Sequence, residues 1–338
     1  GKMKKIICLA MSLMCLSSVF LFTGCQKKEE KEFRMGLGIY AYYSDLKDAD
    51  SENNGSGKTV LTAAAIIIDG DGKIYDCKID TLENIAGFSV NGEFLTAGEF
   101  KTKKEKGDDY HMKSQSSVKK EWYEQAASFE KVVKGKDLKQ IKELLATGGK
   151  GNDEVINAGC TIDISDFIKA LEKSFDSAKD SKAYNGVSLG LGIVSSQTGS
   201  KHASEDADGV NRIDISVVIS AKDGDGKVVD MISDSVQTEI KFDKNGKIKS
   251  KSSDDIKTKR ELGDSYGMKK HGTDRNGDGK VGEWYEQADA FENFCTGKKE
   301  SEISSFVAND GYGIADLQRA GCTISVSDIV RAAVKSMK

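Results

Sequence analysis

AGCTIDISDF at residues 158–167 and AGCTISVSDI at residues 320–329 are two copies of one ten-residue stretch. In each copy, a turn of small residues is followed by a threonine, Thr161 or Thr323, and by a short run that is typical of a β-strand. A Ser-Asp pair then precedes apolar residues at helical spacing. The stretch therefore predicts a strand-to-helix junction that is made twice, once near the end of each half of the chain.

The residue types within the stretch support a purely structural interpretation. Gly159 and Gly321 permit a positive φ in the turn. Ser165 and Ser327 are expected to cap the following helix, and the aspartate after each serine is favourable in a first helical turn. In this interpretation, the two threonines only pack and hydrogen-bond locally.

Other segments recur with the same order, so the whole chain is duplicated. Gly36–Ile39 matches Gly190–Ile193 at an offset of 154 residues. The further matches are Asp69–Lys73 with Asp223–Lys227 at 154, Lys101–Lys103 with Lys257–Lys259 at 156, and Glu121–Ala126 with Glu283–Ala288 at 162. The last increase falls on residues 273–279, which we interpret as an insertion. We expect the first repeat at 34–176, a polar linker at 177–185 and the second repeat at 186–338.

Each repeat has strand patterns first and helical patterns after them. The expected strands are 35–43, 59–68 and 73–80, and 188–195, 212–220 and 227–233 in the second repeat. Asp-Gly and Asn-Gly pairs between these runs predict hairpins. The expected helices are 122–133, 138–145 and 167–175, with 284–295, 303–307 and 329–337 in the second repeat. The predicted fold is α+β: each repeat is an antiparallel sheet of hairpins followed by helices packed on one face.

Composition restricts the class of protein. The chain has 338 residues, 31% of them charged, and a formal net charge of −4. A dedicated nucleic-acid-binding protein would normally be basic, so we expect no nucleic-acid partner. There is no proline, so turns depend on glycine, asparagine, aspartate and serine. No Ser/His/Asp or Cys/His arrangement recurs with the repeats, which disfavours a hydrolase.

Residues 1–25 have the pattern of an export signal. Two lysines precede an apolar run from Ile6 to Phe22, and small residues lead to Cys25. The run Phe22–Cys25 resembles a bacterial lipobox, which implies lipid on Cys25 and an extracytoplasmic protein anchored to the membrane. Residues 26–33 are then expected to be a charged tether. An uncleaved anchor helix is the alternative, because the apolar run is at the low end of bilayer-spanning length.

Four cysteines remain outside that signal, and two of them are matched between the repeats. Cys160 and Cys322 are matched, whereas Cys77 and Cys295 are not. No CxxC or Cys/His spacing occurs, so a zinc site is not expected. An exported protein permits disulfides, but we expect all four to be small buried thiols.

The repeated stretch also resembles the attachment motif of the FMN-binding domain family. In this family, a hairpin sheet and a helix are followed by a small-Gly-small-Thr turn that leads into a final helix. Its members include the C subunit of the sodium-translocating NADH:quinone reductase and the G subunit of the Rnf complex. This chain has Ala and Cys where the family motif has Ser and Ala, and Val155 and Leu317 stand where it has an acidic residue.

The resemblance implies a cofactor and its site. FMN would be joined through its phosphate to the hydroxyls of Thr161 and Thr323. The flanking residues Gly159, Gly321, Cys160 and Cys322 would complete the cofactor-binding turns. A glycine turn beside a helix start suits a phosphate, because free N–H groups and the helix dipole favour an anion. The implied protein is a flavin-based electron carrier with redox partners, not an enzyme with its own substrate.

Several motifs keep two interpretations. The Trp-Tyr pairs at 122–123 and 284–285 are suited to stacking on a flavin, but their helical spacing favours core packing. Lys103 and Lys259, in a tract shared by both repeats, line either a ligand cleft or a solvated face. Gly-x-Gly at 36–38 and 190–192 lacks the third glycine of a dinucleotide fingerprint, so it indicates close backbone packing.

The insertion resembles the first half of a calcium-binding loop. Asp274, Asn276 and Asp278 occupy ligand positions one, three and five, and Gly279 stands at the sharp turn. Position twelve is Tyr285 instead of glutamate. The loop is therefore either a structural calcium site or a plain surface loop. The functional alternatives to the flavin carrier are a solute-binding lipoprotein without flavin and a calcium-dependent scaffold module.

Overall fold

A computed structural model describes residues 32–338 except 96–97 and 252–254. The signal segment 1–25, its Cys25 and most of the tether lie outside the described residues. Phe33, assigned to the charged tether, instead begins the first strand and is buried. Its ring packs edge-on against Tyr75 at 5.1 Å between centroids, which explains why an apolar residue ends that charged run. No helix in the described part of the chain is long and apolar enough to cross a membrane.

The first repeat consists of strands followed by helices. Its elements are β1 (Phe33–Lys47), β2 (Gly55–Ile68), β3 (Ile74–Phe88), β4 (Phe94–Leu95), α1 (Lys103–Lys106), the 3₁₀ turn η1 (Gly107–Tyr110), α2 (Trp122–Val133), α3 (Leu138–Lys142), η2 (Thr147–Gly149), α4 (Asp153–Asn157) and α5 (Ser165–Asp176). The expected linker at 177–185 contains β5 (Lys179–Ser181), which pairs with β1.

The second repeat has the same order, except that one helix is added and no 3₁₀ turn among its described residues corresponds to η2. Its elements are β6 (Ser188–Ser196), β7 (Gly209–Lys222), β8 (Val228–Phe242), β9 (Ile248–Lys251), α6 (Lys259–Leu262), η3 (Gly263–Tyr266), α7 (Met268–His271), α8 (Trp284–Cys295), α9 (Glu300–Ile303), α10 (Ala315–Arg319) and α11 (Ser327–Ser336). The added helix α7 lies directly before the insertion.

The strands form two antiparallel sheets, in the orders β4-β3-β2-β1-β5 and β6-β7-β8-β9. The expected Asp-Gly hairpins join β2 to β3 and β7 to β8. In the first of them, Gly72 has φ +76° and the Asp69 carboxylate accepts the N–H groups of Asp71 and Lys73. The α+β prediction of hairpin sheets followed by helices is confirmed.

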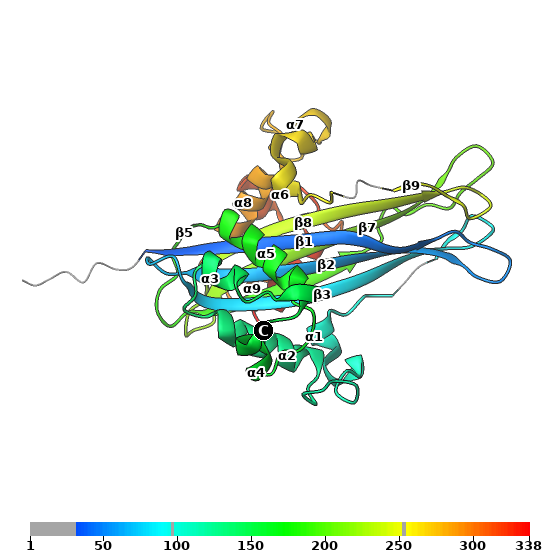
Figure 1. The fold of residues 1–338 in the computed structure, drawn as a ribbon. Coiled ribbons are helices and arrows are strands. Elements are labelled where there is room, and N and C mark those ends of the chain that lie inside the picture. The colour runs from blue at the N-terminus through cyan, green and yellow to red at the C-terminus, as the bar shows by residue number, and fades with distance from the viewer. Residues whose placement is uncertain (1–31, 96–97, 252–254) are drawn as a thin grey trace, which may run out of the picture. The chain divides into compact units, whose positions relative to one another are not determined.

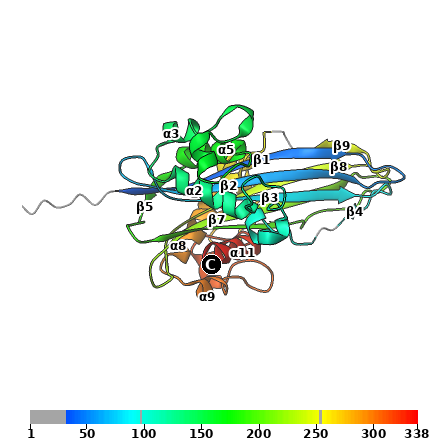
Figure 2. The same cartoon turned by 60° about the horizontal axis from the view of Figure 1, so that its bottom comes forward.

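Each sheet has two buried faces, because alternate residues point to opposite sides. In β2, Leu61, Ala63, Ala65 and Ile67 belong to a core that also contains the alternate residues of β7 from Ile213 to Ala221. The opposite face of β2 packs against helices of the first repeat. The sheets therefore lie face to face between two layers of helices (Figures 1 and 2). Residues 32–338 form one compact unit.

Glycines allow the last helix of each repeat to approach its sheet closely. A Cβ on Gly38 would lie 1.9 Å from the backbone oxygen of Ala170 in α5. A Cβ on Gly192 would lie 2.0 Å from the backbone oxygen of Ala332 in α11. The prediction of close backbone packing at the Gly-x-Gly segments is confirmed, and it fixes α5 and α11 over the first strands of their repeats.

Contacts between the repeats come in reciprocal pairs. The N–H of Ala49 donates to the carbonyl of Gly246 at 2.8 Å, and the N–H of Ala203 donates to that of Gly92 at 2.7 Å. The ion pairs Lys173–Glu261 and Lys335–Glu105, both 2.6 Å, repeat this exchange. The rings of Phe88 and Phe242 stack on each other at 4.6 Å. Such self-complementary pairing indicates that the repeats are related by an approximate twofold axis.

The structure corrects three expectations near the repeated stretch. The short strand expected after each threonine is a single bridge residue, Asp163 or Ser325, and a short helix, α4 or α10, precedes the turn, so the junction is helix to helix. Ser165 and Ser327 are the first helical residues and not caps; the N–H of Ser165 donates to the carboxylate of Asp163. The helix expected at 303–307 is α9, which ends at Ile303. These elements span four or five residues, too few to show a helical period.

Candidate functional site

A buried glutamine holds the threonine of the first repeat. Gln125 on α2 is fully buried, and its side-chain oxygen accepts both the N–H of Thr161 at 2.8 Å and its hydroxyl at 3.1 Å. The Gln125 amide group donates to Ser116 and to the carbonyl of Lys120. A carboxamide with these partners has one orientation only. The threonine hydroxyl is therefore fixed on the wall of the helical layer.

The second repeat contains the same arrangement. Gln287 on α8 is 2% exposed, and its oxygen accepts the N–H of Thr323 at 2.8 Å and its hydroxyl at 2.9 Å. Its amide group donates to the carbonyl of Gly282 at 2.9 Å. The loop before each helix is held in the same way, because Glu121 and Glu283 accept the N–H groups of Met112 and Met268, both at 2.8 Å. Both threonines are half-buried.

The turn before each threonine has the predicted backbone. Gly159 has φ +96° and Gly321 has φ +106°, a region that favours glycine. Cys160 and Cys322 are free and buried, as are Cys77 and Cys295. Burial raises the pKa of the Cys160 thiol to about 11 and that of Cys322 to about 12. The prediction of four buried thiols is confirmed, and Cys160 and Cys322 belong to the hydrophobic cores of their repeats.

A cavity of about 450 Å³ opens next to the repeated stretch of the first repeat, although Thr161 itself does not line it. Its lining includes Trp122, Met112 and Ile162, the residue after the threonine. Charged and polar groups complete the wall: Tyr42, Glu83, Lys103, Lys150, Asp163 and Asp166. The volume lies within the usual range for small-molecule sites, and an aromatic wall with a few polar groups is their usual composition.

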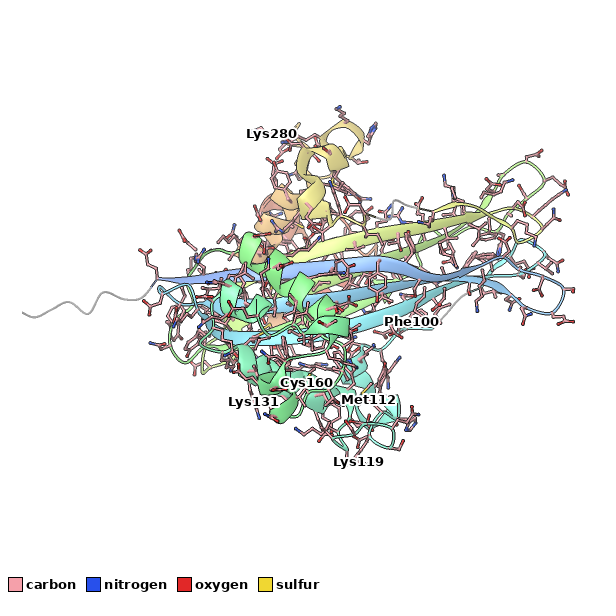
Figure 3. The ribbon with its side chains drawn as sticks, in the orientation of Figure 1. Phe100, Met112, Lys119, Lys131, Cys160 and Lys280 are labelled. Atoms are coloured by element: carbon pink, nitrogen blue, oxygen red, sulfur yellow. The ribbon has the colours of Figure 1, made fainter. Side chains whose placement is uncertain are left out.

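A cavity of about 310 Å³ occupies the equivalent place in the second repeat. Thr323 and Gln287 line it directly. The equivalents of first-repeat wall residues recur, namely Lys259, Met268, Trp284 and Ile324. Met112 and Cys160 mark the first site, and Lys280, next to the insertion, lies on the opposite side of the two sheets (Figure 3). The duplication therefore produces two cavities at equivalent places, the second lined by Thr323 and the first by Ile162, the residue after Thr161.

Lys103 and Lys259, for which the sequence left a ligand cleft and a solvated face as alternatives, line these cavities. Lys103 lies 5.3 Å from the ring centroid of Tyr110 and 5.7 Å from that of Trp122. Lys259 lies 5.1 Å from the ring of Tyr266 and 5.5 Å from that of Trp284. Cation–π contacts of this kind order a cation at the edge of an apolar wall. The ligand-cleft interpretation fits these lysines better than the solvated-face interpretation.

The first cavity carries acidic groups that the second does not. Lys103 pairs with Glu83 at 2.9 Å, and Tyr42 donates to Asp166 at 3.1 Å. Burial raises the pKa of the Asp166 carboxyl and that of the Tyr42 hydroxyl. In the second repeat, Gln237 stands at the position of Glu83, at the same place in the strand register. The two sites therefore share a framework and differ in charge.

The predicted calcium loop is closed by its own hydrogen bonds. The Asp274 carboxylate accepts the N–H groups of Gly277 and Gly279, and the amide of Asn276 donates to Asp278 at 3.0 Å. Across the described ranges, no cluster of three or more His, Cys, Asp or Glu side chains is arranged to hold a metal ion. Calcium at this loop remains a prediction. The loop places Arg275 against the ring of Tyr312, 3.3 Å from its centroid.

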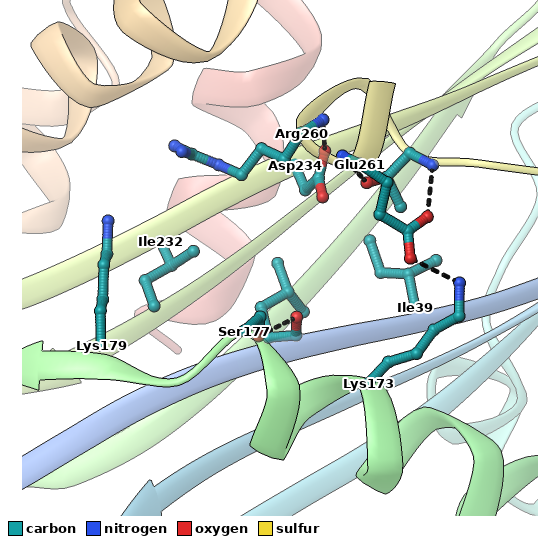
Figure 4. Close-up of a pocket in the computed structure, with 10 residues that line it drawn as sticks. Ile39, Lys173, Ser177, Lys179, Ile232, Asp234, Arg260 and Glu261 are labelled. Atoms are coloured by element: carbon teal, nitrogen blue, oxygen red, sulfur yellow. Dashed lines mark hydrogen bonds and ion pairs between the residues drawn. The ribbon is translucent and has the colours of Figure 1, made fainter. Parts of the chain in front are cut away.

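Two further cavities lie between the repeats, and they are equivalent by the approximate twofold axis. One, of about 220 Å³, is lined by Lys173 of α5, by Ser177 directly after that helix, and by Asp234 and Arg260 of the second repeat (Figure 4). Its counterpart, of about 380 Å³, has Lys335 and Ser336 of α11 and Asp80 and Lys104 of the first repeat.

A buried aspartate lines each of these cavities. Burial raises the pKa of both Asp80 and Asp234 to about 6. Each accepts the N–H of Lys104 or Arg260, at 3.1 Å. These aspartates therefore tie the strands β3 and β8 to the helices that carry Lys103 and Lys259.

The two glutamines are the functional residues that the sequence analysis missed. Gln125 and Gln287 lie inside the repeated segment Glu121–Ala126 and its copy, at the same offset of 162 as the threonine stretch. That shared offset is the one signal that links them to Thr161 and Thr323. A contact between residues 36 positions apart leaves no other trace in a single sequence.

Comparison with known proteins gives one match of limited extent. The chain is 26% identical over 166 residues to a protein named chlorophenol reductase from Desulfitobacterium hafniense. The match covers 44% of this chain and 49% of that protein, so the chain spans about half the length of the curated relative it matches. No family model matches the chain. No solved structure matches it either.

Proposed function

We propose that the protein is a flavin-binding redox protein that holds one FMN at each repeat. The observation that carries this proposal is the duplicated site, in which a buried glutamine fixes a threonine hydroxyl near a cavity with a tryptophan in its wall. Thr323 lines the second cavity itself, and Ile162, the residue after Thr161, lines the first. A purely structural role for the turn does not explain why both repeats have a cavity near it. The similarity to a protein whose name is a reductase supports a redox role.

The residues around each cavity fit an FMN molecule in chemical type. Trp122 and Trp284 pack in the cores of their repeats, as their helical spacing predicts, and each also contributes to a cavity wall. Lys103 and Lys259 offer a positive charge beside them. Bound FMN would supply the redox chemistry, while the protein supplies position and electrostatics. Attachment would form a bond between the hydroxyl oxygen of Thr161 or Thr323 and the FMN phosphorus of a flavin dinucleotide. The pyrophosphate bond of that donor would break, the nucleoside monophosphate would leave, and the hydroxyl proton would pass to solvent. After attachment, the threonine could no longer donate a hydrogen bond from its hydroxyl to Gln125 or Gln287. The hydrogen bond from its backbone N–H to the same glutamine oxygen would remain.

The test of this proposal is flavin incorporation into threonine variants. The full chain, expressed with a flavin transferase, is expected to be yellow and to carry flavin on peptides containing Thr161 and Thr323. The double variant Thr161→Ala, Thr323→Ala is expected to be colourless. Thr273→Ala is the matched control, because Thr273 also lines the second cavity and lies outside the repeated stretch. Covalent flavin retained by the double variant would remove the site assignment.

A protein that stays colourless and binds neither FMN nor riboflavin would favour the alternative of a solute-binding protein that keeps the scaffold. The duplicated cavities favour a ligand in either case. A thermal-shift screen of small solutes then becomes the next measurement.

We also propose that the protein works outside the cytoplasmic membrane, held there by lipid on Cys25, and passes electrons to a redox partner. The lipobox-like sequence Phe22–Cys25 supports this location. Cys25→Ser is expected to move the protein from the membrane fraction to the soluble fraction. An unchanged membrane association in that variant would contradict the lipid anchor.

A further inference from the structure

The two cavities differ most in their charged lining. The first has two cations, Lys103 and Lys150, and three carboxylates, Glu83, Asp163 and Asp166. The second has two cations, Lys259 and Arg275, together with His271 and no carboxylate. A cavity whose wall holds cations and no acid attracts an anion, and the low-dielectric wall strengthens that attraction.

Individual substitutions between the repeats account for this difference. Glu83 is replaced by Gln237, and Asp163 is replaced by Ser325, which lines the second cavity. The carboxylate of Asp214 lies on a neighbouring strand, but Arg212 neutralises it at 2.9 Å. Two of the three acidic positions of the first cavity are therefore uncharged in the second.

The insertion provides the second cavity with its arginine. Tyr312 occupies the position of Lys150, and its ring forms the platform on which the guanidinium of Arg275 lies. Asp310 is the nearest carboxylate to Arg275, at 3.8 Å, which is too long for a paired fork. Arg275 is about one-third exposed, so its donors remain available to a ligand.

We infer that the second cavity is an oxyanion site for a phosphomonoester, and that Arg275 makes the second repeat prefer the phosphate-bearing form of its ligand. The planar fork of an arginine matches two phosphate oxygens at once, and stacking on Tyr312 fixes its direction. The insertion then has a function that its calcium-like sequence does not suggest: it builds a wall of the cavity. The choice of FMN as the ligand rests on the proposed function, whereas the anion site does not.

The chain's two tryptophans allow each cavity to be observed separately, because one lines each of them. In full-length Trp122→Phe, fluorescence reports only on Trp284 and the second cavity. In Trp284→Phe, it reports only on the first cavity. Protein prepared without flavin is titrated in both backgrounds with FMN, riboflavin and inorganic phosphate.

In the second cavity, we expect FMN to bind at least about tenfold more tightly than riboflavin, since charge-assisted bonds to phosphate are strong. Inorganic phosphate is expected to compete with FMN. In the first cavity, the two flavins are expected to bind within about twofold of each other, because its carboxylates oppose the phosphate charge.

Arg275→Ala is expected to abolish the FMN preference and phosphate competition at the second cavity while leaving riboflavin affinity within about twofold. Arg275→Lys, which keeps the charge but not the fork, is expected to be intermediate. Arg319→Ala is the matched control: it removes one exposed arginine of the same repeat that pairs with Asp316 and does not line the cavity. Arg275 lies on an exposed loop, so unchanged circular dichroism is expected for its variants.

The outcomes separate this inference from the proposed function. Arg275-dependent binding of phosphate without binding of either flavin supports the anion site and overturns the flavin function. Equal binding of FMN and riboflavin, unaffected by phosphate, overturns the anion site and leaves the flavin function in place. An equal loss of FMN binding in Arg275→Ala and Arg319→Ala also overturns the role of Arg275.

Discussion

At the scale of single residues, the site depends on glutamines that have no freedom to rotate. The oxygen of Gln287 accepts two donors from Thr323, and its amide group is already engaged. A side chain with every polar atom paired holds its neighbours in one geometry. The hydroxyl that we propose as the attachment point is thus positioned by the fold before any ligand arrives.

Gln287→Leu tests this positioning role through stability. The change leaves the N–H and hydroxyl of Thr323 without their acceptor, which is expected to lower the free energy of unfolding by about 1–3 kcal/mol. Gln287→Glu keeps an acceptor and is expected to lose less. Urea denaturation followed by the fluorescence of Trp284 measures both. A Leu variant as stable as the parent chain would contradict the role.

Asn84 is expected to destabilise the fold, because its side chain is buried without hydrogen-bond partners in the described part of the chain. It is fully buried, and neither its amide nitrogen nor its oxygen has a hydrogen-bond partner among the residues that the structure describes. Asn84→Leu removes two unpaired polar groups at similar volume, so we expect the free energy of unfolding to rise by about 1–3 kcal/mol.

The matched control for this change is Asn211→Leu. Asn211 is equally buried, but it accepts from Gln197 and donates to the carbonyl of Gly87 at 2.8 Å. Leucine at that position is expected to destabilise the protein. Thermal unfolding of both variants gives the comparison, and equal signs for the two changes would contradict our account of Asn84.

Asp80 and Asp234 predict how stability depends on pH. Burial raises the pKa of each carboxyl from its ordinary value of 3.8 to about 6, so the folded chain keeps protons that the unfolded chain releases. This contribution to stability is complete below about pH 4 and is lost as the pH rises through about 6, by roughly 3 kcal/mol for each residue.

The double variant Asp80→Asn, Asp234→Asn removes both titrations and keeps oxygen acceptors for the backbone. We expect the parent chain to lose more stability between pH 4 and 7 than this variant does. Urea denaturation across that range measures the difference. Parallel pH profiles of the two proteins would show that these carboxyls do not carry the effect.

At the scale of elements, glycines decide how the last helix of each repeat lies on its sheet. Gly38→Ala would place a methyl group 1.9 Å from a backbone oxygen of α5, so helix and strand must separate. We expect the free energy of unfolding to fall by about 1–3 kcal/mol. Gly224→Ala is the control, because no atom lies within 4 Å of the added methyl group. A Gly38→Ala protein as stable as the control would be inconsistent with this packing.

The elements that the sequence predicted well are those with a strong local pattern. The Asp-Gly turns and the faces of α2 and α8 follow from residue type and spacing alone. The strands β3 and β8 continue eight or nine residues beyond their predicted ends, because sheet pairing extends through polar residues such as Thr81 and Glu83. The short helices α4 and α10 were missed because five residues show no period.

At the scale of the whole molecule, the two repeats depend on each other for their core. The inner faces of both sheets meet in one cluster of buried residues, and Phe88 and Phe242 stack across the approximate twofold axis. The duplicated sequence predicted two similar units but not that they share a core. No local pattern records which surface of a sheet will meet a second sheet.

Phe242→Ala tests this interdependence. Removing a fully buried ring is expected to lower the free energy of unfolding by about 3–5 kcal/mol. Because the core is shared, Trp122 in the first repeat and Trp284 in the second are expected to report the same shifted transition. Single-tryptophan variants measure the two transitions separately. An unchanged first-repeat transition would mean that the repeats unfold independently.

The candidate site was predicted in part. The repeated threonines and the cavity-lining lysines came from comparing the two copies, whereas the glutamines and the charge difference between the cavities required the structure. In the sequence, the exchange of Asp163 for Ser325 is an ordinary substitution between two turn-forming residues. The structure places both residues in cavity walls, so the second cavity lacks a carboxylate that the first has.

The most direct test of the central claim is the flavin content of the protein purified from the cells that make it. Intact mass and peptide mapping, combined with the visible absorbance spectrum, give both stoichiometry and position. Our account predicts two FMN groups per chain, one on the peptide with Thr161 and one on the peptide with Thr323. A chain of unmodified mass, without flavin absorbance and with no affinity for added FMN, would contradict it.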